Sequence, residues 1–146
     1  MIFEEPKNSS YFSMKELISF RMEKSNEAFT DAQNTYKTAS YNLVVNRLYY
    51  AVFYMVSAVL LKFQISGKTH KGIKTVFQEK FVKTGIISKK TSKIYDELFK
   101  MRNDGDYEDF VIYTKKKVDP LFNLVSMVLS ELTNLIEQPD PADASK

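Results

Sequence analysis

Arg102 is followed, at helical spacing, by side chains that can either pair with its charge or share an anion with it. Asp106 comes four residues later and Tyr107 five, so a helix over this stretch places Arg102 and Asp106 on one face. A guanidinium stays charged at any physiological pH and offers a fork of N–H donors that matches a carboxylate or a phosphate. The spacing therefore predicts an ion pair within the helix or an anion-binding site, and the residue types leave both open.

A second arginine, Arg47, lies at the start of the most apolar stretch of the chain, residues 48–61. An unpaired buried guanidinium is too costly to persist. We therefore expect Arg47 to be largely buried and to pair with a carboxylate, that of Asp106. Beside Arg47, the polar residues Asn46, Tyr50 and Tyr54 recur every four residues, as on one face of a helix. Asn46, Arg47, Tyr50 and Asp106 form a predicted structural polar cluster.

Few groups in the chain can transfer a proton near neutral pH. His70 is the single histidine, and the absence of cysteine excludes thiolate zinc sites, iron–sulfur ligation and a cysteine nucleophile. His70 could act as a general acid or base, but its place at the start of a short helix is more typical of a packing or surface position.

The acidic segment 104–109 (DGDYED) fits a calcium-binding loop poorly, because Gly105 directly follows the first aspartate instead of holding the sixth position. The segment favours a helix terminus and polar turn over a weak divalent-cation site. We expect neither a metal site nor a cofactor.

The elements that position these groups are predicted to be helices. The first runs from about residue 14 to residue 36, where Ser13 and Glu16 have the spacing of a capping box and an apolar stripe follows (Ile18, Met22, Phe29, Ala32, Tyr36). The second, roughly 40–64, is apolar or aromatic throughout residues 48–61 except at Ser57. It is the predicted central helix, buried on nearly all sides.

Three further helices complete the expected architecture, an all-α bundle of about five helices. Thr69 caps the third, and the fourth has a stripe at Thr91, Ile94, Leu98 and Met101. Gly105 is expected to end the fourth helix. The fifth begins either after Thr114 or at Asp119, where a proline follows the aspartate.

The chain reads as a single domain, 13–137, between a lead-in at 1–12 and a polar tail at 138–146. The apolar run of residues 48–61 is shorter than the roughly 20 residues that a membrane span needs, so no membrane association is expected. The start of the chain, MIFEEPKNSSYF, lacks the basic region and apolar run of a signal peptide. We expect a cytoplasmic protein.

The net charge of +3 is mild, and the run Lys115–Lys117 is typical of a solvated face. Nucleic-acid-binding proteins usually carry a denser basic stripe. The composition therefore allows an RNA or nucleotide partner without requiring one.

Three stretches of the chain together resemble the HEPN family of small helical domains. They are NRLYYAVFYMVSAVLL at 46–61, THKGIKTVFQEKFVKTGII at 69–87 and MRNDGDY at 101–107. The resemblance implies an up-and-down bundle that pairs as a symmetric dimer. The supply of apolar rings, eleven Phe and nine Tyr, favours a homodimer as well. Many members are metal-independent ribonucleases, often toxins neutralised by a minimal nucleotidyltransferase, whereas others are thought to bind nucleotides.

Active members of this family carry an arginine, a polar residue and then a histidine after four to six intervening positions. By resemblance Arg102 and Asn103 take the first two places, as phosphate-binding residues, but the histidine position falls on Tyr107, Glu108 or Asp109. Tyrosine, with a pKa near 10, is a poor base at neutral pH.

The resemblance therefore implies a dimeric binding module for a phosphate, a nucleotide or a partner protein, with a degenerate ribonuclease motif. The alternative is an atypical ribonuclease toxin, with a nucleotidyltransferase-type antitoxin as its partner, that uses Tyr107, Glu108 or His70 in place of the missing histidine.

Overall fold

The computed structural model describes residues 13–139 and is helical throughout its regular structure. Its elements are α1 (Met14–Tyr36), α2 (Tyr41–Lys62), α3 (His70–Phe77), a π-helical turn η2 (Gln78–Val82) that continues α3, α4 (Lys89–Tyr107) and α5 (Lys115–Glu137). The all-α prediction is confirmed. The predicted lead-in at 1–12 and all but the first two residues of the predicted tail lie outside the described residues.

Side-chain caps start four of the five helices. Ser13, Thr69, Ser88 and Thr114 each accept a hydrogen bond from the backbone N–H three residues later, which satisfies one of the free donors at a helix start. The caps at Ser13 and Thr69 were predicted. The cap at Thr114 decides where α5 begins, so Pro120 lies inside this helix and not at its start.

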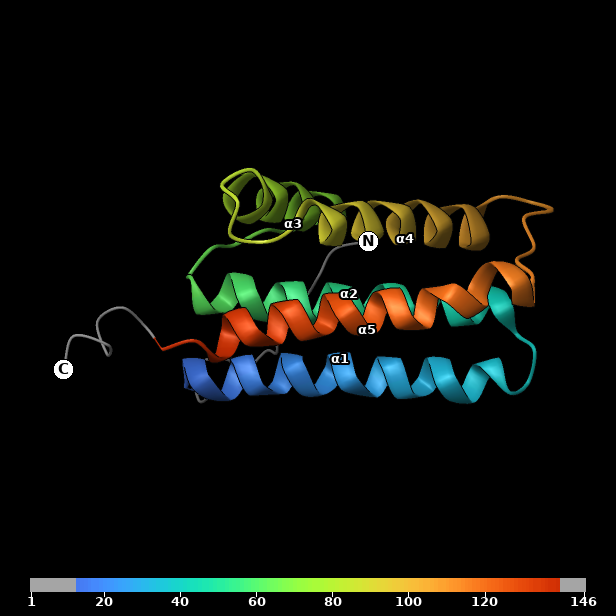
Figure 1. The fold of residues 1–146 in the computed structure, drawn as a ribbon, viewed down its shortest axis with the longest axis horizontal. Coiled ribbons are helices and arrows are strands. Elements are labelled where there is room, and N and C mark those ends of the chain that lie inside the picture. Colours follow the sequence, from blue (N-terminus) through green and yellow to red (C-terminus); the bar gives the residue numbers. More distant parts are fainter. Residues whose placement is uncertain (1–12, 140–146) are drawn as a thin grey trace.

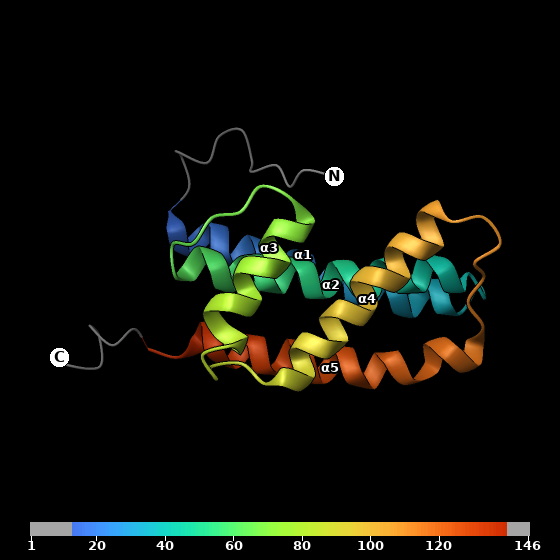
Figure 2. The same ribbon diagram turned by 90° about the horizontal axis from the view of Figure 1, so that it is seen from above.

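Helix α2 is the centre of the bundle and packs against α1, α4 and α5. Figure 1 shows α3 and α4 as one layer above α2 and α5, with α1 on the opposite side, and the view from above places α5 beside α2 and beneath one end of α4 (Figure 2). By length and composition alone α2 could cross a membrane, but 72% of its most apolar window is buried in the bundle. It is the core helix of this fold.

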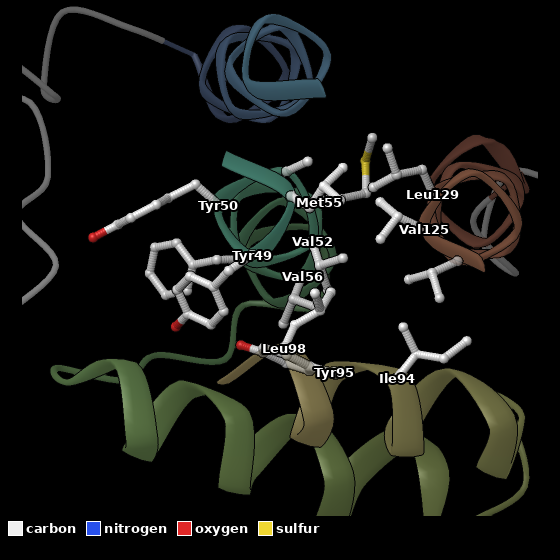
Figure 3. Close-up of a cluster of buried hydrophobic side chains, with 14 of the residues drawn as sticks. Tyr49, Tyr50, Val52, Met55, Val56, Ile94, Tyr95, Leu98, Val125 and Leu129 are labelled. Carbon is white, nitrogen blue, oxygen red and sulfur yellow. The ribbon is translucent and has the colours of Figure 1, made fainter. Parts of the chain in front are cut away.

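The main core forms where α4 and α5 meet α2. In Figure 3 Val52, Met55 and Val56 of α2 face Val125 and Leu129 of α5, and Tyr95 and Leu98 approach from α4. Tyr49 and Tyr50 leave α2 on the side away from α5 (Figure 3). This second side of α2 holds the polar groups described below.

The buried face of α1 differs from the predicted stripe. It consists of Arg21, Ser25, Ala28 and Ala32, whereas Met22, Phe29 and Tyr36 are half-buried along its border. Ser25 donates a hydrogen bond to the carbonyl of Ala51 over 2.6 Å. Small side chains let α1 lie close to α2, and the Ala51 carbonyl of α2 gives the buried Ser25 hydroxyl its hydrogen-bond partner.

Gly105 does not end α4, contrary to the prediction. The helix runs through it to Tyr107, and the backbone N–H of Glu108 closes the last turn on Asp104. The missing side chain at Gly105 makes room for the ring of Tyr113, since an added Cβ would lie 3.1 Å from that ring. As a result Arg102 and Asp106 are one helical turn apart.

Candidate functional site

Arg102 is buried, with 4% of its surface exposed, and its donors point at partners within the chain. Nη2 donates to the hydroxyl of Tyr50 over 3.1 Å, and Nη1 donates to Oδ1 of Asn103 over 3.2 Å. Nε lies 3.1 Å from Oδ2 of Asp106, an ion pair between residues four apart. The Nε–H direction does not align with that oxygen, so Nε has an ion-pair contact but no hydrogen bond. Arg102 is thus held in place by its own helix and by α2.

Three tyrosine rings surround the guanidinium of Arg102. Their centroids lie 5.3 Å (Tyr49), 5.4 Å (Tyr50) and 5.8 Å (Tyr107) from its central carbon, within the range of cation–π attraction. Burial raises the pKa of Tyr50, with Arg102 opposing the rise. The Tyr50 hydroxyl therefore keeps its proton and can accept the hydrogen bond from Arg102.

Arg47 is only half-buried and has an amide as its partner, so the predicted pair with Asp106 is wrong. Nε and Nη2 of Arg47 donate to Oδ1 of Asn46 over 3.1 and 2.7 Å, and its guanidinium lies 5.0 Å from the ring of Tyr50. Asp106 instead pairs with Arg102, because the two share one face of α4. Nδ2 of Asn46 donates to the same carboxylate over 3.1 Å.

The polar cluster of Asn46, Arg47, Tyr50 and Asp106 therefore does assemble, with Asn46 as the bridge between Arg47 and Asp106. The cluster and Arg102 contain two guanidinium groups and one carboxylate. Within residues 13–139, no ion pair joins Arg47 to a carboxylate. The site carries one positive charge in excess, on the more accessible of its two arginines, and an anion would complement it.

His70 lies on the inner side of this site and is 5% exposed. Its Nδ1 is 2.9 Å from the hydroxyl of Tyr49, and its ring stacks on Phe53 with centroids 4.2 Å apart. Burial, and then the charge of Arg102, lower the pKa of His70 to about 4. The imidazole is therefore neutral at pH 7 and serves as a packed, hydrogen-bonded part of the core.

Acid should destabilise the protein through His70. Its pKa in the folded chain lies below the unfolded value of about 6.5, so the unfolded state binds a proton first as the pH falls. The neutral His70 therefore contributes about 2–3 kcal/mol to the free energy of unfolding above about pH 6.5, and this contribution is lost as the pH falls towards 4. Urea denaturation at several pH values should show it as a difference from His70→Gln, and parallel pH profiles for the two proteins would contradict the assignment.

The remaining catalytic candidates, Tyr107 and Glu108, lie at the end of α4. Tyr107 is its last residue and is 68% exposed, with its ring against Arg102, and Glu108 is the exposed C-cap. The structure thus brings Arg102, Asn103 and Tyr107 together and puts His70 near Arg102, behind the rings of Tyr49 and Tyr50. Among residues 13–139, no three His, Cys, Asp or Glu side chains converge in a way that could hold a metal ion.

Two features of this region were missed from the sequence. Arg21 of α1 is buried and donates from Nη1 to the carbonyl of Ser57 over 3.0 Å; its spacing from Ser25 and Ala28 was the available signal. The loop after α4 presents apolar side chains to solvent, with Phe110 98% and Ile112 81% exposed.

Asn42 of α2 holds that loop in place. Its side chain donates to the carbonyl of Val111 and accepts from the backbone N–H of Tyr113, each over 2.8 Å. The half-exposed Leu43 follows Asn42 in the chain. Leu43, Tyr107, Phe110 and Ile112 are therefore exposed apolar residues at one end of the bundle, beside the arginine site. We call these four residues the end patch.

Comparison with known proteins places the chain among related sequences. The family model described as the HEPN domain matches residues 18–135. A protein of Thermotoga maritima named "UPF0332 protein" is 33% identical over 123 residues, which cover 84% of this chain and 93% of the relative.

Two proteins of Methanocaldococcus jannaschii are also similar. One, named "Putative toxin MJ0142", is 28% identical over 70% of this chain and 69% of its own length. The other, named "Putative toxin MJ0605", is 29% identical over 64% of this chain and 70% of its own length.

Proposed function

Because the chain belongs to the HEPN domain family, we propose that it is a homodimeric HEPN-type binding module that holds the phosphate of a nucleotide or RNA at its arginine site. One observation carries the proposal: the half-buried guanidinium of Arg47 has an amide and an aromatic ring as partners, beside an Arg102 that Asp106 already balances. The excess positive charge suits one phosphate group.

The two arginines have different roles in this proposal. Arg102 and Asn103 are hydrogen-bonded to each other, and Arg102 is buried. They reach a phosphate only if the carboxylate of Asp106 moves aside. Arg47 is the residue that meets the phosphate first, and Arg102 keeps Tyr50 and Asp106 in place around it.

Nucleolytic chemistry has little support at this site. Tyrosine occupies position 107, where the active members place histidine, and a phenol is a much weaker general base than an imidazole. The only histidine, His70, is packed against Phe53 and has a pKa of about 4. Binding is therefore the better supported function.

The phosphate site predicts that binding depends on Arg47. Titration of the protein with AMP, ATP and inorganic phosphate, followed by calorimetry, should show weak binding that falls as the salt concentration rises. Arg47→Ala should remove at least about 90% of the affinity, since a charge-assisted contact is worth about 1.5–3 kcal/mol.

Arg47→Lys is the matched control, because it keeps the charge but loses the fork. It should retain part of the affinity. If Arg47→Ala binds all three anions as tightly as the wild type, phosphate does not bind at the arginine site.

The end patch supports the homodimer. Isolated monomers seldom leave several large apolar side chains exposed together, and a two-fold interface buries the same patch on both copies. Light scattering at micromolar concentration should give about twice the chain mass of 17.0 kDa. The substitutions Phe110→Asp and Ile112→Asp together should give the monomer mass, and a wild type that already scatters as a monomer would rule the dimer out.

The names of two relatives favour a second candidate function, a ribonuclease toxin neutralised by a nucleotidyltransferase-type partner. Both M. jannaschii proteins have toxin in their names and are similar to more than 60% of this chain. The chain would then act in the cytoplasm, with Tyr107, Glu108 or His70 in the place of the histidine. Expression in a bacterial host separates the candidates, since a toxin arrests growth and a binding module does not.

A further inference from the structure

The mild net charge of the chain conceals a strong separation of charge. Residues 68–102, which form α3, η2 and most of α4, contain nine lysines and Arg102 against three carboxylates, a formal net charge of +7. Since the whole chain carries +3, the remaining residues carry −4. The positive charge is therefore concentrated in the layer that lies above α2 and α5 in Figure 1.

The lysines of this layer point away from the core. On α4 the buried residues share one side, and Lys89, Lys93 and Lys100, spaced four and seven apart, occupy the opposite side. Eight lysines of the layer are exposed: Lys68, Lys71, Lys80, Lys83, Lys89, Lys90, Lys93 and Lys100. We call these eight residues the lysine face.

The layer is held together by its own polar contacts. Lys74 of α3 pairs with Asp96 of α4, and Gln78 of η2 donates to Ser92 and Asp96 over 3.0 and 2.9 Å. Glu97 pairs with Lys117 of α5. Two of the three carboxylates of the layer, Asp96 and Glu97, thus pair with lysines that do not belong to the lysine face. Within residues 13–139, no ion pair joins the lysine face to a carboxylate.

We infer that the lysine face binds the phosphate backbone of a nucleic acid. A protein partner fits poorly, because lysine is depleted at protein interfaces, where large apolar side chains are enriched. Only one large hydrophobic residue of the layer, Ile86, is exposed. No exposed aromatic ring lies among residues 68–102 to stack on bases, and Tyr107, at the end of α4, lies against Arg102. The contacts are therefore with phosphates, and binding is independent of sequence.

The helix starts within the layer agree with this inference. Neither α3 nor α4 has an acidic residue in its first turn, where carboxylates are stabilising, and Lys71, Lys89 and Lys90 are found there instead. On the inner side of α4, the carboxylate of Glu131 from α5 accepts hydrogen bonds from the hydroxyl groups of Ser88 and Thr91. The outer side of this helix start is left to the lysines, which an approaching phosphate would neutralise.

The inference goes beyond the arginine site and is independent of it. A suitable test measures fluorescence polarisation with a labelled 20-nucleotide single-stranded RNA and a 20-base-pair DNA duplex, both of mixed sequence, over a range of salt concentrations. The wild type should bind both with a steep salt dependence. The triple variant K89E/K93E/K100E should bind at least about tenfold more weakly near 0.1 M salt. The slope of its log affinity against log salt concentration should be shallower, corresponding to the loss of about two to three phosphate contacts.

A matched triple variant, K15E/K37E/K116E, changes three exposed lysines outside the layer and alters the net charge equally. It should lose much less affinity, and K89Q/K93Q/K100Q should fall between the wild type and the charge reversal. K89E/K93E/K100E should bind AMP and inorganic phosphate like the wild type, which separates this face from the arginine site.

Equal losses in the two triple variants would overturn the inference, because they would show an effect of net charge alone. Binding to phosphatidylserine vesicles without binding to RNA or DNA would overturn it too. Binding of only one nucleic acid by the wild type, lost in K89E/K93E/K100E, would support the face and identify its ligand.

Discussion

Tyr107→His is expected to give the protein a metal-independent ribonuclease activity, which we do not expect of the wild type. The substitution restores the arginine–histidine motif at its shortest spacing, at the end of α4 and against the guanidinium of Arg102. Position 107 is 68% exposed, so an imidazole there would titrate near its ordinary pKa of about 6.5 and could accept the proton of a 2′-hydroxyl. Proton transfer of this kind typically contributes about 10²–10⁴ in rate.

The measurement is cleavage of a fluorescent RNA in the presence of EDTA. Tyr107→Phe is the matched control, because it keeps the ring beside Arg102 and removes the hydroxyl. A Tyr107→His protein that folds, forms the dimer and still leaves RNA intact would show that more than the histidine has been lost from the site.

Arg102→Ala is expected to destabilise the fold by about 2–4 kcal/mol. The substitution leaves the Asp106 carboxylate without its ion-pair partner and removes the hydrogen bond from Arg102 to the Tyr50 hydroxyl. It also opens a space between three tyrosine rings. The loss should be smaller than for a fully buried pair, because the side chain of Asp106 is 28% exposed.

Urea denaturation measures this loss, and Arg47→Ala is the control. Its guanidinium is half-buried and bonded to an amide, so its removal should cost less than about 1 kcal/mol. Adding Asp106→Asn to Arg102→Ala should recover part of the stability, since it removes the stranded charge. An Arg102→Ala protein as stable as the wild type, beside an unfolded Arg47→Ala protein, would reverse the roles given to the two arginines.

Much of the fold could be predicted because it depends on local signals. Ser13 and Thr69 cap helices wherever the next residues are helical, and the long apolar stretch of α2 can be accommodated only at the centre of a bundle. Gly105 shows where local signals fail. A glycine usually ends a helix, but here it remains helical because the ring of Tyr113, eight residues later in the chain, packs against it.

The site was predictable in its members but not in its pairings. Asn46, Arg47, Tyr50, Arg102 and Asp106 all converge as their types suggested. The four-residue spacing of Arg102 and Asp106 allowed the ion pair that forms. The expected pair of Arg47 with the same carboxylate depended on the distance between α2 and the end of α4, and no spacing along the sequence contains that distance. The buried Arg21 and Ser25 were missed for the same reason, since carbonyl groups of α2 satisfy both.

The lysine face was also not predicted from the sequence. A net charge of +3 suggested no particular affinity for nucleic acid. The layer formed by α3, η2 and α4 nevertheless carries eight exposed lysines between positions 68 and 100. Summing charge over the chain hides this separation, whereas summing it over one layer reveals it.

A site that binds phosphate without cleaving RNA is tested most directly by incubating the purified wild-type protein with total RNA in EDTA at pH 7.5. Tyr107→Phe and a buffer control accompany it, and the RNA is resolved on a denaturing gel. The account predicts intact RNA in all three samples. RNA cleaved by the wild type and left intact by Tyr107→Phe would contradict it, because Tyr107 would then be the catalyst of a ribonuclease.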